Sequence, residues 1–165
     1  MMGEELKKSG VSRLIGIDII PEAYDATIRD RPGIYDAYFV EDFTCLTEEK
    51  KEEINSWQCD CMVTVAALGF GDIPVTAFVE AFNIITSEGW VAFNIKDSFF
   101  DTTDDSGFSR LIREMTFSKY LDVYYIERYR HRLSIEGEPL YYFAIVGRKK
   151  SDVPYEFLTS KGISV

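Results

Sequence analysis

Two aspartates stand where a carboxylate can bind a nucleoside. Asp18 and Asp42 each follow a short apolar run of the kind that forms a buried strand. A carboxylate at such a strand end can accept two hydrogen bonds from the paired hydroxyls of a ribose, which suits Asp18. A carboxylate at the next strand end can accept from the exocyclic amine of adenine, which suits Asp42. Each acid alone also fits an ordinary loop start, but together they favour a nucleoside site, with Ile19 or Phe43 against the base.

Small residues follow a third apolar run. Ala66, Ala67 and Gly69 would let the backbone approach a ligand closely, because they carry little or no side chain. A tight turn explains the same residues equally well, so both interpretations stay open.

The chain has one histidine, so any Ser-His or Cys-His mechanism must use His131. Arg130 and Arg132 flank it, and both guanidinium groups disfavour an imidazolium between them. An ordinary strand histidine is therefore the favoured interpretation. No residue stands out as a general base, and the catalytic residues stay unassigned.

No metal site is expected. The acidic run that begins at Asp101 resembles a calcium loop in composition only. An EF-hand loop needs glycine at its sixth position and glutamate at its twelfth, where this chain has Ser106 and Ile112. The three cysteines include a C-x-C pair rather than C-x-x-C, and buried, reduced thiols are the favoured interpretation.

These residues need a scaffold that brings successive strand ends together. Apolar runs alternate with segments of helical periodicity, and two strands joined by a short turn end the pattern. The expected strands are 13–18, 36–40, 61–66, 90–95, 121–133 and 140–147. This order predicts an α/β fold, a three-layer sandwich whose mostly parallel sheet ends in an antiparallel hairpin. Residues 1–150 are expected to form one domain and residues 151–165 a surface tail.

The charge balance narrows the possible partners. The chain has 28 acidic against 18 basic residues, a formal net charge of −10, which disfavours binding to nucleic acid or to an anionic membrane. No apolar run approaches the ~20 residues of a membrane helix, and the first residues lack the apolar core of a signal peptide. We expect a cytoplasmic protein with a small-molecule substrate.

Taken in order, these segments resemble a known superfamily. Residues 14–22 (LIGIDIIPE) look like the second motif of class I S-adenosylmethionine-dependent methyltransferases, and residues 41–43 resemble the third. Residues 59–68 resemble the fourth motif, and residues 84–90 look like the superfamily's leucine-lysine-proline-glycine-glycine turn. Residues 66–74 (AALGFGDIP) are similar to the methyltransferase-like proteins of the Williams–Beuren region.

One motif of the superfamily is missing from the pattern. Its first strand and G-x-G-x-G loop normally lie about 20 residues before the acid that Asp18 matches, and 17 residues precede Asp18. The missing strand would lie between those that end at Asp18 and Ala66, so its loss leaves a gap of roughly 10 Å. The chain is then a truncated form of a fuller enzyme, or the flanking strands pair directly, or another chain supplies the strand in a homo-oligomer.

The resemblance implies methyl transfer from S-adenosylmethionine to a small-molecule acceptor, by an enzyme that is inactive if the loop is essential. It implies these contacts: Asp18 with the ribose, Asp42 with the adenine amine, Ile19 and Phe43 beside the adenine, and Ala66 and Ala67 near the methionine end. A non-catalytic binding or assembly protein with this fold is the alternative. A nicotinamide-dependent oxidoreductase needs the same missing loop, and the terminal hairpin argues against it.

Overall fold

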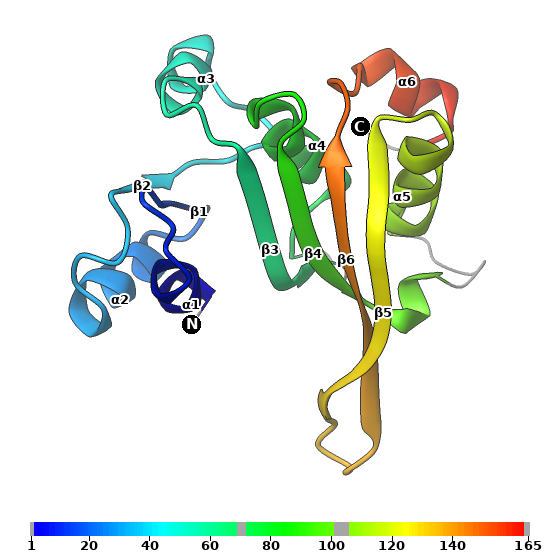
Figure 1. The fold of residues 1–165 in the computed structure, drawn as a ribbon, viewed down its shortest axis with the longest axis horizontal. Helices are drawn as coiled ribbons and strands as arrows, with labels where there is room; N and C mark the ends of the chain where they lie inside the picture. Colours follow the sequence, from blue (N-terminus) through cyan, green and yellow to red (C-terminus); the bar gives the residue numbers. More distant parts are fainter. Residues whose placement is uncertain (1, 69–71, 101–105, 164–165) are drawn as a thin grey trace. The chain divides into compact units, whose positions relative to one another are not determined.

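The computed structural model describes residues 2–68, 72–100 and 106–163 (Figure 1). The chain divides into two compact units, Met1–Leu46 and Thr47–Val165. No helix within the described ranges is long and apolar enough to cross a membrane.

The first unit holds two parallel strands and two helices. Its elements are α1 (Met2–Lys8), β1 (Ile15–Asp18), α2 (Pro21–Asp30) and β2 (Ala37–Val40). Pro21 begins α2, as predicted, because its fixed φ suits the first helical position and its missing N–H is not needed there. β1 and β2 pair from Ile15 with Ala37 to Asp18 with Val40, so both strands end at one edge.

The second unit is a four-stranded sheet in the order β3-β4-β6-β5. Its strands are β3 (Cys61–Leu68), β4 (Trp90–Lys96), β5 (Leu121–Leu133) and β6 (Pro139–Lys149), and its helical segments are α3 (Glu48–Asn55), α4 (Val75–Ile84), η1 (Asp97–Phe100), α5 (Phe108–Phe117) and α6 (Tyr155–Ser160). β3 and β4 are parallel, whereas β6 is antiparallel to both β4 and β5. The predicted α/β architecture with a terminal hairpin is therefore confirmed.

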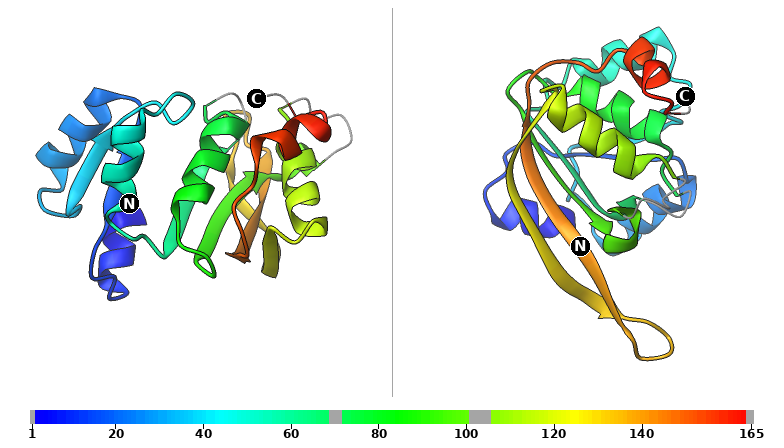
Figure 2. Two further views of the ribbon diagram at one scale, coloured as in Figure 1. Left: turned by 90° about the horizontal axis from the view of Figure 1, so that it is seen from above. Right: turned by 90° about the vertical axis from the view of Figure 1, so that its right-hand side faces the viewer.

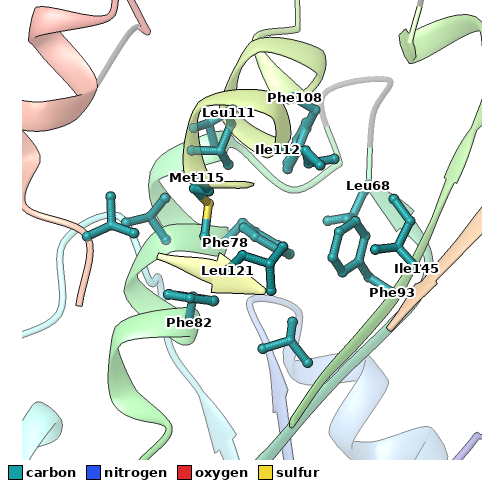
Figure 3. Close-up of a cluster of buried hydrophobic side chains, with 14 of the residues drawn as sticks. Leu68, Phe78, Phe82, Phe93, Phe108, Leu111, Ile112, Met115, Leu121 and Ile145 are labelled. Atoms are coloured by element: carbon teal, nitrogen blue, oxygen red, sulfur yellow. The ribbon is translucent and has the colours of Figure 1, made fainter. Parts of the chain in front are cut away.

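The core lies between this sheet and the helices α4 and α5 (Figure 3). Phe78 and Phe82 of α4 are buried, and the ring of Phe78 meets that of Phe93 of β4 with centroids 5.4 Å apart. Leu111 and Met115 of α5 are fully buried beside them. Each such side chain contributes about 1.5–3 kcal/mol by leaving water.

Within the described part of the second unit, no helix covers the opposite face of the sheet (Figure 2). Because side chains alternate along a strand, the residues between the core-facing Val91, Phe93 and Ile95 point to this open face. Asn94 is one of them, and it is nevertheless only 4% exposed.

The ladders form two sets, one in each unit, whereas Asp18 and Ala66 were expected to end strands of a single sheet. β1 pairs with β2, and β3 lies at the outer position of the four-stranded sheet. No ladder joins the two strands that flank the expected gap among the described residues.

The C-terminal segment is part of the core, so the expected surface tail is also wrong. Val153, Leu158 and Ile163 are buried at 1%, 0% and 3% exposure. Just before them, the ammonium of Lys149 is 1% exposed and donates to the carbonyls of Asn83 at 2.6 Å and Ile85 at 2.5 Å. It thereby satisfies carbonyls at the end of α4, where a positive charge is favourable.

The cysteines are reduced but are not buried as expected. Cys45 and Cys61 are exposed, and Cys59 is half-buried.

Candidate functional site

Asp18 and Asp42 both lie at the carboxyl edge of the β1–β2 pair. Asp18 is the last residue of β1, and its carbonyl oxygen accepts from the N–H of Glu41 at 3.0 Å, directly after β2. Asp42 is the next residue. The sequence prediction that two consecutive strands deliver two carboxylates to one edge holds within this unit.

The carboxylate of Asp18 has one oxygen to spare. Its Oδ1 accepts from the N–H of Ile20 at 3.0 Å, which shapes the entry to α2. Its Oδ2 has no partner in the described part of the chain. A carboxylate oxygen has two lone pairs, so Asp18 can still accept from paired hydroxyls.

The carboxylate of Asp42 accepts more hydrogen bonds from its own loop than that of Asp18 does. Its Oδ1 accepts from the hydroxyl of Thr44 at 2.7 Å and from the N–H of Thr44 at 2.8 Å. These bonds, the hydroxyl's first and then the N–H's, with a smaller contribution from Cys45, hold the pKa of Asp42 below its usual range. The group is therefore ionised at neutral pH and can still accept from an amine.

The two apolar neighbours differ in access. Ile19 is 59% exposed and can lie against a planar ring, whereas Phe43 is 7% exposed and offers little open surface.

Ala66 has an unusual backbone at the end of β3. Its φ of 57° lies in the left-handed region, which costs roughly 1–2 kcal/mol for a residue with a Cβ. The register of β3 against β4 shifts between Thr64 and Leu68, and the N–H of Ala66 donates instead to Oδ1 of Asn94 at 2.6 Å. Ala67 follows, half-buried, and Gly69 lies outside the described residues.

A chain of hydrogen bonds continues from Asn94 to the only histidine. Nδ2 of Asn94 donates to Oη of Tyr129 at 2.7 Å, and that oxygen lies 3.1 Å from Nδ1 of His131. The imidazole also packs on the ring of Tyr142, with centroids 4.4 Å apart. His131 is therefore not an isolated strand residue. Sequence reasoning missed Asn94, Tyr129 and Tyr142 because no local spacing links them.

A neighbouring arginine is structural. Arg128 pairs with Asp97 at 2.8 Å, directly after β4, and its guanidinium lies 3.8 Å from the centre of the Tyr141 ring. These contacts tie β5 to the carboxyl end of β4.

The remaining sequence expectations and cavities add no further site residue. The acidic run 101–105 lies outside the described residues. Across the described ranges, no three Asp, Glu, His or Cys side chains gather around a possible metal position. A mainly apolar cavity of about 360 Å³ lies between α5 and the β5–β6 ladder, lined by residues that include Ile112, Phe117 and Ile126. None of the residues predicted to bind a ligand lines it.

Comparisons of the sequence with protein families and with curated proteins find no match. Comparison of the structure with solved structures does find similar folds. A methyltransferase from Methanosarcina mazei described as SAM-dependent superimposes with a TM-score of 0.56 at 16% identity, over 83% of this chain and 82% of that one. The N-methyltransferase NodS from Bradyrhizobium japonicum gives a TM-score of 0.52 at 16% identity, over 84% and 74% of the two chains.

A third structure is an O-methyltransferase family protein from Burkholderia thailandensis. It gives a TM-score of 0.53 at 12% identity, over 92% of this chain but 48% of that one. The likeness to these three proteins is one of fold.

Proposed function

Because the chain has the fold of class I S-adenosylmethionine-dependent methyltransferases, we propose that it binds S-adenosylmethionine and belongs to a methyl-transfer reaction. One observation carries the proposal. Asp18 ends β1, Asp42 follows the end of the adjacent parallel strand β2 by two residues, and Asp18 keeps a carboxylate oxygen that has no partner among the described residues. Ligands of open α/β sheets bind at this carboxyl edge.

In this proposal the first unit binds the nucleoside half of the cofactor. Asp18 accepts from the ribose hydroxyls and Asp42 from the adenine amine, since both groups are acceptors and both ligand groups are donors. Ile19 supplies exposed apolar surface for one face of the adenine. Phe43 contributes less, because little of its ring is open.

For Ala66 and Ala67 we keep the role that the resemblance implies, a contact with the methionine end, and support it from the local backbone of β3 alone. The left-handed Ala66 supports this role, because strained backbone positions held by surrounding structure cluster at ligand sites. When bound, the cofactor supplies an electrophilic methyl group, and the protein's task is to hold donor and acceptor in line. The acceptor is proposed to be a small molecule, in keeping with the net charge of −10.

Calorimetric titration of the full chain with S-adenosylmethionine and S-adenosylhomocysteine tests the proposal. We expect binding on the order of micromolar, and a loss of about tenfold or more in Asp18→Ala, since one charged hydrogen-bonding group contributes about 1.5–3 kcal/mol. Asp25→Ala is the matched control, because Asp25 is an exposed acid on α2 of the same unit.

The alternative is a non-catalytic binding or assembly protein with the same fold. The strand ladders favour it, because no ladder joins β1 to β3 among the described residues. Absence of binding to either cofactor form would support this alternative, whereas binding that is equal in wild type and Asp18→Ala would contradict the placement of the ribose.

A further inference from the structure

The β5–β6 hairpin extends past the rest of its sheet at the carboxyl end of β4. The last pair between β4 and β6 joins Lys96 to Tyr142, while β5 and β6 remain paired as far as Leu133 and Pro139 (Figures 1 and 2). The extension therefore lies at the edge where ligands of such sheets bind. We call the paired segments 129–133 and 139–142 the hairpin arm.

A bulge sets the direction of the side chains on the arm. Arg130 pairs with Tyr141 and Arg132 with Leu140, so His131 is an extra residue in β5. Cross-strand partners share a face, and residues two apart on one strand do too, so Arg132 lies on the face of Leu140 and Tyr142. The contact of His131 with the Tyr142 ring places it on this same face, and Arg130 lies on the other.

The hydrogen bonds that lead to His131 favour one tautomer of its ring. The backbone N–H of Ala66 can only donate, so the amide oxygen of Asn94 must face it and the amide nitrogen must face Tyr129. The hydroxyl of Tyr129 then accepts from Asn94 and has its own proton left for Nδ1 of His131. With Tyr129 as the donor to Nδ1, the neutral imidazole carries its proton on Nε2, which is then a hydrogen-bond donor.

Within the described residues, neither arginine beside His131 forms an ion pair. Arg128 is paired with Asp97, but Arg130 and Arg132 have no partner within the described residues. An imidazole N–H and a guanidinium on one face are donors only, so they suit a ligand that accepts hydrogen bonds and carries negative charge. Two residues that contact this group, Asn94 through Tyr129 and Tyr142 through the His131 ring, are buried at 4% and 5% exposure.

We propose that His131 and Arg132 form a recognition site for an oxyanion group, a carboxylate or a phosphate, of the molecule that receives the methyl group. Its role in methyl transfer rests on the proposed function, whereas the site itself rests only on residues of the second unit. Tyr129 and Asn94 act as positioning residues, because they hold the imidazole in its donating form.

Nuclear magnetic resonance titration of the full chain without cofactor tests the site. Sodium phosphate and sodium acetate serve as separate probes, with chloride replaced at constant ionic strength. We expect saturable shifts of the His131 ring nitrogens and the Arg132 Nε with one or both probes, at affinities on the order of millimolar. The stronger probe identifies which oxyanion the site prefers.

Matched variants distinguish specific binding at His131 and Arg132 from a non-specific attraction of anions to positive charge. Arg132→Gln should weaken binding of the preferred probe about tenfold or more, and Arg130→Gln, on the opposite face, should leave it within about twofold. Equal losses in the two variants, or no saturable shift with either probe, would overturn the proposal. Unchanged thermal unfolding of both variants shows that each is folded.

Tyr129→Phe tests the positioning role. Removing the hydroxyl leaves Nδ1 without its donor, so the nitrogen-15 shifts of His131 should move toward a mixture of the two neutral tautomers, with weaker probe binding. A merely structural tyrosine would leave the tautomer unchanged. Oxyanion binding without S-adenosylmethionine binding would refute the cofactor assignment alone, and the reverse result would refute this site alone.

Discussion

Ala66 shows how a single residue can be held in an unfavourable backbone conformation. Its left-handed φ of 57° persists because its N–H donates to the buried amide of Asn94 rather than to the strand ladder. Apolar runs that end on acids made the positions of Asp18 and Asp42 predictable. The Asn94–Tyr129–His131 chain of hydrogen bonds could not be predicted from the sequence. Asn94 and Tyr129 are 35 residues apart, and the pairing of the strands in the sheet brings them into contact.

We expect Ala66→Gly to stabilise the protein. Glycine removes a left-handed strain of about 1–2 kcal/mol and adds about 0.5–1 kcal/mol of chain entropy to the unfolded state, so the net gain is about 0.5–1 kcal/mol. Urea unfolding measures it. Ala67→Gly is the control and should lose about 0.5–1 kcal/mol, because Ala67 lacks a positive φ. A comparable loss in both variants would show that Ala66 is not strained.

The Tyr155–Glu80 pair should make stability depend on alkaline pH. The hydroxyl of Tyr155 donates to the carboxylate of Glu80 at 2.5 Å, and Glu80 is 6% exposed. Burial, and then this bond, raise the pKa of Tyr155 from 10.0 to about 12. The unfolded chain therefore loses the phenol proton first as pH rises, so the contribution is complete below pH 10 and is lost between pH 10 and about 12.

The measurement compares urea unfolding of the wild type with that of Tyr155→Phe across this range. The wild type's advantage should be constant below pH 10 and should shrink as the pH approaches 12. An advantage that stays constant up to pH 12 would rule out the coupling.

At the scale of elements, the periodicity of apolar residues and the residues typical of helix starts predicted where helices begin. Pro21 begins α2, and Thr47 caps α3 by accepting from the N–H of Lys50 at 3.3 Å, both as expected. The burial of the C-terminal segment was not predicted, because Val153, Leu158 and Ile163 are spaced five residues apart. This spacing matches neither a helix of 3.6 residues per turn nor a strand of period two. Only the tertiary structure places all three in one core.

Leu158→Ala should therefore destabilise the protein by about 2–5 kcal/mol, the usual cost of a cavity at a fully buried leucine. Glu156→Ala, on the exposed side of the same helix, should change the free energy of unfolding by less than about 0.5 kcal/mol. Chemical denaturation of the two variants measures these changes. Similarly small changes in the free energy of unfolding in both variants would show that the C-terminal segment is a surface tail.

At the scale of the whole molecule, the two units have unequal cores. Every member of the large buried cluster belongs to the second unit, whereas the buried apolar residues of the first are Phe39 and Phe43. Composition predicted one domain of ordinary size, because a count of apolar residues does not say how they are shared between units. The sequence predicted that one strand is missing from the strand order. It did not predict which of the remaining strands pair, because that depends on contacts between residues far apart in the chain.

We expect the fragment Thr47–Val165 to fold alone. Thermal unfolding followed by circular dichroism should show one cooperative transition within about 5 °C of the main transition of the full chain. The fragment Met1–Leu46 should show none, because domains of about 40 residues are marginal without disulfides or metals. A fragment 47–165 without a cooperative transition would mean that its cluster is not an independent core.

The burial of Lys149 has a consequence for chemical labelling. Its ammonium is held by the carbonyls of Asn83 and Ile85 and pairs with Asp152 at 2.6 Å, so an acylating reagent can reach the free amine only after β6 separates from α4. Exposed lysines react from the folded state and report on the surface. The rate at which Lys149 is acylated instead measures how often the core opens. This rate would report unfolding of the protein even in a mixture as complex as a cell extract.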